Sequence, residues 1–184
     1  MTDMLTIDGR IAQMRPVAPE DADELRALYE TASPESVHLR FFAQGGLLID
    51  REIARLCRTP EPGFHALTAT FADRIVGVAS CERTRDPRHA EFAVFVADDW
   101  QGHGIATLLL EQLTADARRD GITELTGTVL PGNSRMTKVA AGLAPHAPID
   151  HDHETLTVHL PTEPSADALA AMEARRRKAE EAGA

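Results

Sequence analysis

A chain of 184 residues can form one domain with a buried core, and its 43% hydrophobic and 26% charged residues are ordinary for a globular protein. The formal net charge of −10 argues against a nucleic-acid partner, because binding a phosphate backbone requires a basic surface. The two cysteines, Cys57 and Cys81, have the spacing of neither a disulfide framework nor a metal site, so we expect free thiols. No apolar run is long enough for a membrane-spanning helix, and we expect the protein in the cytoplasm.

Turn and capping signals divide the first half of the chain. Asp8-Gly9 is a hairpin pair, and Ser33-Pro34 is an N-cap followed by proline at the first helical position. Gly45-Gly46 breaks the chain, and we expect Asp50 to cap the helix that follows. The expected elements are a hairpin at residues 5–12, helices at 18–29, after Ser33 and at 50–57, and a hairpin of strands 64–71 and 74–83.

The second half alternates strands and helices. Residues 91–97 form a near-continuous apolar run, which is typical of a strand buried on both faces. A helix at 102–119 follows, and Gly121 is expected to end it. The remaining expected elements are a strand at 123–130, a helix at 134–141, a polar loop containing His146, His151 and His153, and a last strand at 155–160 that contains His159.

A glycine-rich turn joins the apolar strand to its helix. The backbone N–H groups of a helix start are unpaired, and Gly102 and Gly104 would let an anion approach them closely, which predicts a phosphate or pyrophosphate site. The sequence there is neither a dinucleotide-binding G-x-G-x-x-G nor a Walker A loop. Judged by its glycines alone, it could equally be a tight β–α turn.

The residues around these glycines resemble the GNAT superfamily of N-acetyltransferases. Gln101-x-x-Gly104-x-Ala106 is similar to the family's acyl-CoA signature, and residues 96–100 resemble its V-x-P-x-Y approach, with Asp98 replacing the proline and Trp100 the tyrosine. The resemblance covers roughly residues 10–160. Residues 14–21 and 33–42 also resemble stretches of Pat-type bacterial acetyltransferases, which act on lysines of acyl-CoA synthetases.

This resemblance implies an α/β fold with a mixed, mostly antiparallel twisted sheet and helices on both faces. It implies acetyl-CoA as cosubstrate and no metal. The strand at residues 94–96 would pair with the pantetheine arm, and the turn would bind the pyrophosphate. The implied cofactor-binding residues are Val94, Phe95, Val96, Gln101, Gly102, His103, Gly104, Ile105, Ala106, Thr107 and Asn133. Asn133 could instead be an ordinary turn residue after Pro131-Gly132.

Glu91 is the expected general base. A protonated amine cannot attack a thioester, so a group must first remove its proton. A carboxylate at the start of an apolar strand would be desolvated, which makes it a stronger base. Residues 90–93 also resemble the AExAF strand of GNAT lysine acetyltransferases, in which that glutamate activates the lysine. The alternative is a strand-end glutamate that faces solvent.

One departure from the family concerns the proton donor for the leaving thiolate. Many GNAT enzymes have a tyrosine seven residues after the asparagine, and Ala140 stands there in this chain. The one tyrosine, Tyr29, belongs to the first helix. Water or another group must therefore protonate the thiolate, or the thiolate leaves unassisted.

We expect residues 1–162 to form a GNAT domain and residues 163–184 to form a charged, Ala-rich solvated helix or a linker. The predicted reaction is acetyl transfer from acetyl-CoA to a protein lysine, with an acyl-CoA synthetase as one candidate substrate protein. A small amine or a protein N-terminus is the alternative acceptor. A non-catalytic acyl-CoA-binding module is the alternative from another class. No nucleic-acid or membrane partner is expected.

Overall fold

The computed structural model describes residues 2–42 and 46–183, and within them one eight-stranded sheet forms the centre of the fold. Its strands, in chain order, are β1 (Thr2–Leu5), β2 (Ile11–Pro16), β3 (Phe64–Phe71), β4 (Arg74–Arg83), β5 (His89–Val96), β6 (Glu124–Val129), β7 (Ile149–His151) and β8 (Leu156–Pro161). Their order across the sheet is β1-β2-β3-β4-β5-β6-β8-β7, with β5 and β6 parallel and the other neighbours antiparallel. The predicted mixed, mostly antiparallel sheet is confirmed.

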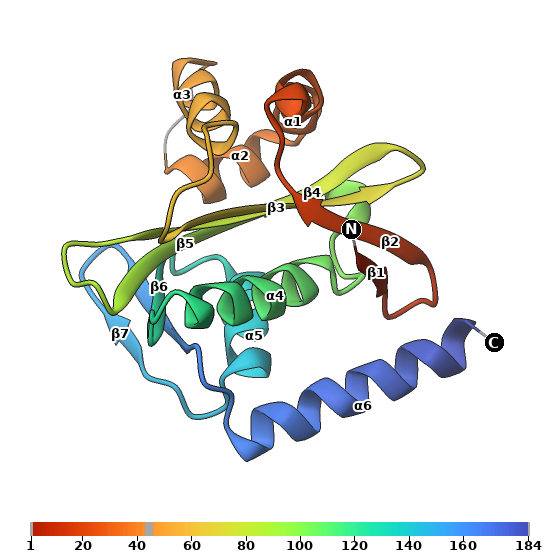
Figure 1. Ribbon diagram of the computed structural model, residues 1–184, viewed down its shortest axis with the longest axis vertical. Helices are drawn as coiled ribbons and strands as arrows, with labels where there is room; N and C mark the ends of the chain where they lie inside the picture. The colour runs from red at the N-terminus through yellow and green to blue at the C-terminus, as the bar shows by residue number, and fades with distance from the viewer. Residues whose placement is uncertain (1, 43–45, 184) are drawn as a thin grey trace.

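Helices cover both faces of the sheet, as predicted (Figure 1). On one face lie η1 (Pro19–Asp21), α1 (Ala22–Glu30), α2 (Pro34–Phe41) and α3 (Gly46–Leu56). On the other lie α4 (Ile105–Arg119) and α5 (Ser134–Leu143), with α6 (Ala166–Gly183) beyond them, while η2 (Asp98–Trp100) connects β5 to α4.

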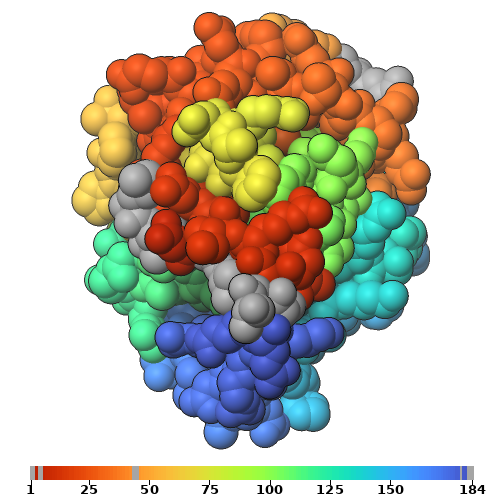
Figure 2. Space-filling model, turned by 90° about the vertical axis from the view of Figure 1, so that its right-hand side faces the viewer, coloured from red at the N-terminus to blue at the C-terminus, as the bar shows by residue number. Residues whose placement is uncertain are grey.

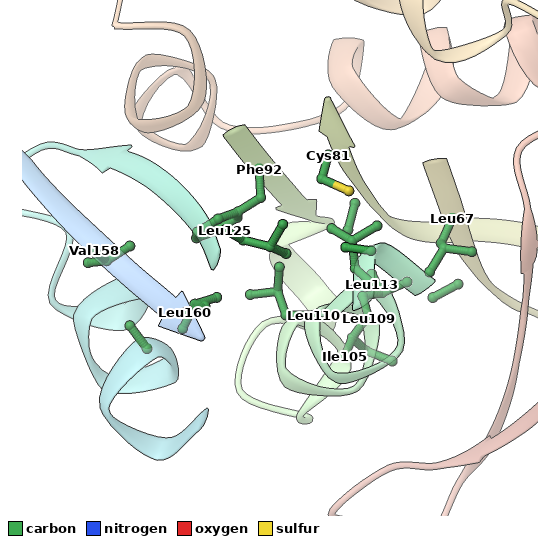
Figure 3. Packing of buried hydrophobic residues seen from close by; sticks show 14 of the residues in the cluster. Leu67, Cys81, Phe92, Ile105, Leu109, Leu110, Leu113, Leu125, Val158 and Leu160 are labelled. Atoms are coloured by element: carbon green, nitrogen blue, oxygen red, sulfur yellow. The ribbon is translucent and has the colours of Figure 1, made fainter. Parts of the chain in front are cut away.

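Strand β5 contributes to the core on both faces. Phe92 packs in the larger cluster, which joins the sheet to Leu109 and Leu113 of α4 (Figure 3). Phe95 points to the opposite face and packs in the second cluster with Leu25 of α1. This two-sided burial explains why the sequence of β5 is an almost continuous apolar run.

Strands β5 and β6 part soon after they begin. Their pairing is limited to residues 89–91 of β5 and 124–126 of β6, although β4 continues to pair with β5 as far as Val96. The ring of Phe92 lies against Gly127, where an added Cβ would come within 2.5 Å of the ring. The ring therefore occupies the point of separation, and among the described residues no strand pairs with the backbone edge of β5 beyond it on the β6 side.

Several local sequence signals correctly predicted helix ends and turns. Ser33 Oγ accepts a hydrogen bond from the Ser36 N–H at 3.2 Å and caps α2. Gly121 ends α4 with a φ of +78°, a conformation that glycine adopts without steric cost. The β3–β4 turn places Ala72 and Asp73 at positive φ, as a two-residue hairpin requires.

Other element boundaries differ from the prediction. Helix α3 begins at Gly46 rather than at an Asp50 cap; Gly45 lies outside the described residues. Helix α4 begins at Ile105 rather than at residue 102, because Gly102 and Gly104 have φ values of +84° and +86°, which a right-handed helix cannot contain. The expected loop includes the short strand β7, which pairs with β8.

The C-terminal segment forms a helix, α6, which is one of the two expected alternatives, and most of its described side chains are exposed. Figure 2 shows α6 lying below the N-terminal strands, and it packs against α5 and β1. Ala168 is buried, and the Arg175 guanidinium pairs with Glu111 of α4 while donating to the Gly142 carbonyl at 3.1 Å. No helix in the described part of the chain is long and apolar enough to span a membrane.

Candidate active-site cleft

The separation of β5 and β6 opens a cleft of about 1100 Å³. Its walls come from β5, the loop that leads into α4, β6 and α5, with α2 and α3 lining one end. Of the predicted site residues, those that line the cleft are Glu91, Val94, Phe95, Val96, Gln101, Gly102, Gly104, Ile105, Ala106, Thr107 and Asn133. The fold thus brings together residues that are spread over more than forty positions of the sequence.

His103 is the exception among these residues, because its side chain faces the N-terminal hairpin. Its Nδ1 lies 3.0 Å from a carboxylate oxygen of Asp8, and its carbonyl accepts a hydrogen bond from the Ile7 N–H at 3.2 Å. His103 therefore fastens the β1–β2 hairpin to the glycine-rich turn, and Ile7 of that hairpin lines the cleft. Unlike the other predicted cofactor-binding residues, His103 is not among the residues that line the cleft.

The start of α4 provides the anion-binding geometry expected of the glycine-rich turn. Gly104 is the N-cap and has no side chain with which to cap the helix. Residues 105–107, which form the first turn, line the cleft, so their N–H groups and the positive end of the helix dipole lie beside it. A phosphate group is the kind of ligand that such a helix start binds.

Glu91 lies where β5 and β6 part, at the α2–α3 end of the cleft. Its side chain is exposed, which corrects the expected desolvation in an apolar strand. Within residues 2–42 and 46–183, no hydrogen-bonding or ion-pair partner of its carboxylate is found. Glu82 stands directly opposite Glu91 on β4, and its carboxylate accepts from Arg58 at 3.0 Å and from Arg55 at 3.3 Å.

A charged network lines this end of the cleft, and nothing in the sequence pattern predicted it. Glu52 of α3 is mostly buried and accepts from Arg40 of α2 at 2.5 Å and from Arg55 at 3.0 Å. Burial alone would raise the pKa of Glu52, but the hydrogen bonds and charges of these two arginines hold it below its ordinary value. Arg55 also donates to Ser80 Oγ of β4 at 2.7 Å, so the network fixes α2 and α3 against the sheet.

Asn133 fits both interpretations of its role. Its side-chain oxygen accepts from the Met136 N–H at 3.1 Å, which makes it the N-cap of α5, and the residue also lines the cleft. Ala140, about two turns further along α5, is buried and has no group that could donate a proton. The side chain at position 140 therefore cannot act as the proton donor that tyrosine provides in many family members.

Tyr29 lies outside the cleft. Its ring is buried in the second core cluster, 4.9 Å from the Phe95 ring and 5.4 Å from the Phe41 ring, measured between centroids. Burial raises the pKa of the Tyr29 phenol above its ordinary value. Tyr29 is thus a core residue rather than an acid placed beside the cofactor.

The signature residue Gln101 connects opposite walls of the cleft. Its amide nitrogen donates to the Val96 carbonyl at 3.2 Å, and its oxygen accepts from Arg135 of α5 at 2.6 Å. Arg135 and Lys138 both line the cleft and are exposed on α5. Neither residue could be recognised from the sequence, because two basic residues of a short helix carry no signal until that helix is placed opposite the glycine-rich turn.

One histidine of the C-terminal strands lies between two carboxylates. His159 of β8 lies 3.1 Å from Glu124 and 3.1 Å from Asp150. Burial lowers the pKa of His159, but these two carboxylates outweigh it and hold the pKa above its ordinary value. In the described part of the chain, no three or more His, Cys, Asp or Glu side chains are arranged to hold a metal ion.

Comparison with known proteins identifies the family. The acetyltransferase (GNAT) family model matches residues 22–142, which is more than half of the chain. An acetyltransferase of Pseudomonas aeruginosa is 27% identical over 157 residues, which cover 83% of this chain and 84% of that protein. The crystal structure of the GNAT domain of S. lividans PAT has a TM-score of 0.79 at 29% identity, covering 87% of this chain and 96% of that one. An acetyltransferase structure from Salmonella typhimurium, solved with acetyl-CoA, shares the fold, with a TM-score of 0.66 at 16% identity and coverage of 84% and 96%. The chain belongs to the GNAT family of acetyltransferases.

Proposed function

We propose that this protein transfers the acetyl group of acetyl-CoA to the ε-amine of a lysine on another protein, with Glu91 as the general base. The observation that carries the proposal is the contrast among the carboxylates at one end of the cleft. Glu52 and Glu82 are held by arginines, whereas Glu91 has no such partner in the described residues and stands where the two strands part. An unpaired carboxylate is free to accept a proton from an incoming amine.

The cofactor would lie along the inner wall of the cleft. The diphosphate would bind at the start of α4, at residues 102–107. The pantetheine arm would pair with the open backbone edge of β5 at residues 94–96, in the way that an added strand extends a sheet. Asn133 would contact this arm from the opposite wall. This arrangement directs the thioester toward Glu91.

The reaction then needs one base and no covalent enzyme intermediate. Glu91 removes a proton from the lysine ammonium, directly or through one water, and the neutral amine attacks the thioester carbonyl. The nitrogen of the tetrahedral adduct gives up its second proton to water, and collapse of the adduct breaks the carbon–sulfur bond, which leaves the amide and releases the CoA thiolate. A thiol has a pKa of about 8.5 against about 10.4 for a lysine amine, so the thiolate can leave without a dedicated acid. The alanine at position 140 is consistent with that route.

A protein acceptor suits the exposed position of Glu91. The side chain lies at the surface end of the cleft, which an extended lysine can reach while its own backbone stays outside. We propose acyl-CoA synthetases as the first substrate proteins to test, because the N-terminal motifs resemble Pat-type enzymes. The free thiols of Cys57 and Cys81 suit the reducing cytoplasm in which such a reaction would occur.

The test is to incubate the protein and host lysate with isotopically labelled acetyl-CoA and to locate the label by mass spectrometry. Label on lysine side chains of a discrete set of proteins, absent with Glu91→Gln, would support the proposal. Label on protein N-termini or on a small amine would show that this group, and not a lysine, is the acceptor. Tight CoA binding without any transfer would instead identify a binding module.

A further inference from the structure

Asp98 occupies the position at which the family approach sequence has proline, and its carboxylate is the centre of a hydrogen-bond network. Oδ2 accepts from the Ser33 backbone N–H at 2.6 Å. Oδ1 accepts from Ser36 Oγ at 2.5 Å and from the Gln101 side-chain amide at 3.0 Å. A proline side chain could make none of these contacts, so all three depend on the aspartate at this position.

The partners of Asp98 belong to separate walls of the cleft. Ser33 and Ser36 form the start of α2, more than sixty residues away in the sequence, whereas Gln101 precedes the glycine-rich turn. Gln101 in turn accepts from Arg135 of α5. A continuous chain of hydrogen bonds therefore runs from α2 through the cofactor loop to α5.

Helix α2 connects the Asp98 hydrogen-bond network to the charged network around Glu52. Its Arg40, at the far end of the helix from Ser33, donates to the buried Glu52. A carboxylate beside a helix N-terminus is favourable electrostatically, and Asp98 supplies it from a distant segment of the chain. The placement of α2 thus depends on where η2 and the cofactor loop lie.

Occupation of the cofactor loop would change the network at Arg135. A guanidinium binds a phosphate oxygen more strongly than the neutral oxygen of an amide, so a diphosphate at residues 102–107 would compete with Gln101 for Arg135. The Gln101 side chain would then be free to strengthen its bonds to Asp98 and Ser36, since its amide already donates to both.

We propose that Asp98 is a positioning residue that couples occupation of the cofactor loop to the placement of α2, and through α2 to the acceptor end of the cleft. The assignment of that end rests on the proposed function. The coupling itself requires only that the cleft binds CoA. An acceptor site that becomes ordered after the cofactor has bound would favour binding of the cofactor first.

Hydrogen exchange measured with and without CoA tests this coupling. In the wild type, saturating CoA should slow exchange of the α2 amides at residues 37–41 by about tenfold, the effect of roughly one hydrogen bond to a charged group. Asp98→Ala should abolish that protection and weaken CoA affinity, measured by calorimetry, by up to about tenfold, because the coupling between the cofactor loop and α2 is reciprocal. The exposed neighbour Asp99 provides the matched control, and Asp99→Ala should behave as the wild type.

Ser36→Ala provides a second variant that keeps the test valid if Asp98→Ala is too unstable to study. It removes one partner of the carboxylate and should weaken the CoA-dependent protection in the same direction. Equal protection of α2 in Asp98→Ala and wild type, or no response of α2 to CoA in the wild type, would overturn the proposal. Because neither readout involves an acceptor, a wrong acceptor assignment would appear in the labelling experiment and leave this result unaffected.

Discussion

Gly104→Val tests whether the turn before α4 binds the cofactor, and Gly121→Val at the other end of the same helix is its matched control. The two glycines have nearly the same backbone conformation, with φ of +86° and +78°. A valine in this region costs about 1–3 kcal/mol. An added Cβ at Gly104 would meet Ile7 Cγ2 at 3.1 Å, an atom of a half-exposed side chain that can move, whereas Gly121 has open space.

Both variants should therefore lose about 2 kcal/mol of unfolding free energy, or about 4–8 °C in Tm for a chain of this size. Only Gly104→Val places a branched side chain where a diphosphate would approach the helix start, so it alone should lose CoA binding in calorimetric titrations. Unfolding by urea in parallel establishes that both proteins are folded. A folded Gly104→Val that bound CoA with wild-type affinity would refute the assignment of this turn.

Three further predictions concern residues outside the glycine-rich turn. Tyr29→Phe should leave turnover nearly unchanged, because the residue lies in the core; a loss of several orders of magnitude in a stable variant would make Tyr29 the acid for the leaving thiolate. Because the pKa of His159 is raised in the folded protein, its pairing with the two carboxylates should stabilise the fold fully below the unfolded pKa of 6.5. This contribution should be lost as the pH rises through the higher pKa of the folded state. His159→Gln should therefore flatten the decline of urea-unfolding free energy above about pH 6.5, and a decline as steep as in the wild type would exclude this origin. Arg175→Met should lower the unfolding free energy by about 1–3 kcal/mol, because it leaves the partly buried Glu111 unpaired, and unchanged urea unfolding would mean that α6 is not held by this ion pair.

The elements that were predicted well are those fixed by neighbouring residues. The cap at Ser33 and the end of α4 at Gly121 depend on backbone conformations that a few adjacent residues determine. The β5 strand was recognisable because both of its faces are buried, which leaves a nearly unbroken apolar run. These signals located most of the elements in chain order, whereas the fold class came from the resemblance to the GNAT family.

The features that were missed depend on contacts between distant segments. Strand β7 is short and mostly polar, and its extended conformation is stabilised by pairing with β8, a contact that the local sequence does not indicate. The packing of α6 includes an ion pair between Arg175 and Glu111, which are 64 residues apart. The exposure of Glu91 was missed for a related reason, since it follows from where β6 departs from β5 and not from the composition of β5.

The central claim, that Glu91 is the base for an amine acceptor, is tested most directly by comparing Glu91→Gln with Glu82→Gln in single-turnover acetyl transfer. These glutamates face each other on adjacent strands, so the two substitutions remove the same charge from the same part of the cleft. We predict that Glu91→Gln lowers the chemical rate by about 10²–10⁴-fold with unchanged CoA affinity, and that Glu82→Gln, whose carboxylate is engaged by arginines, has a much smaller effect. A Glu91→Gln variant that acetylates as fast as the wild type, or a larger loss in Glu82→Gln, would contradict the account.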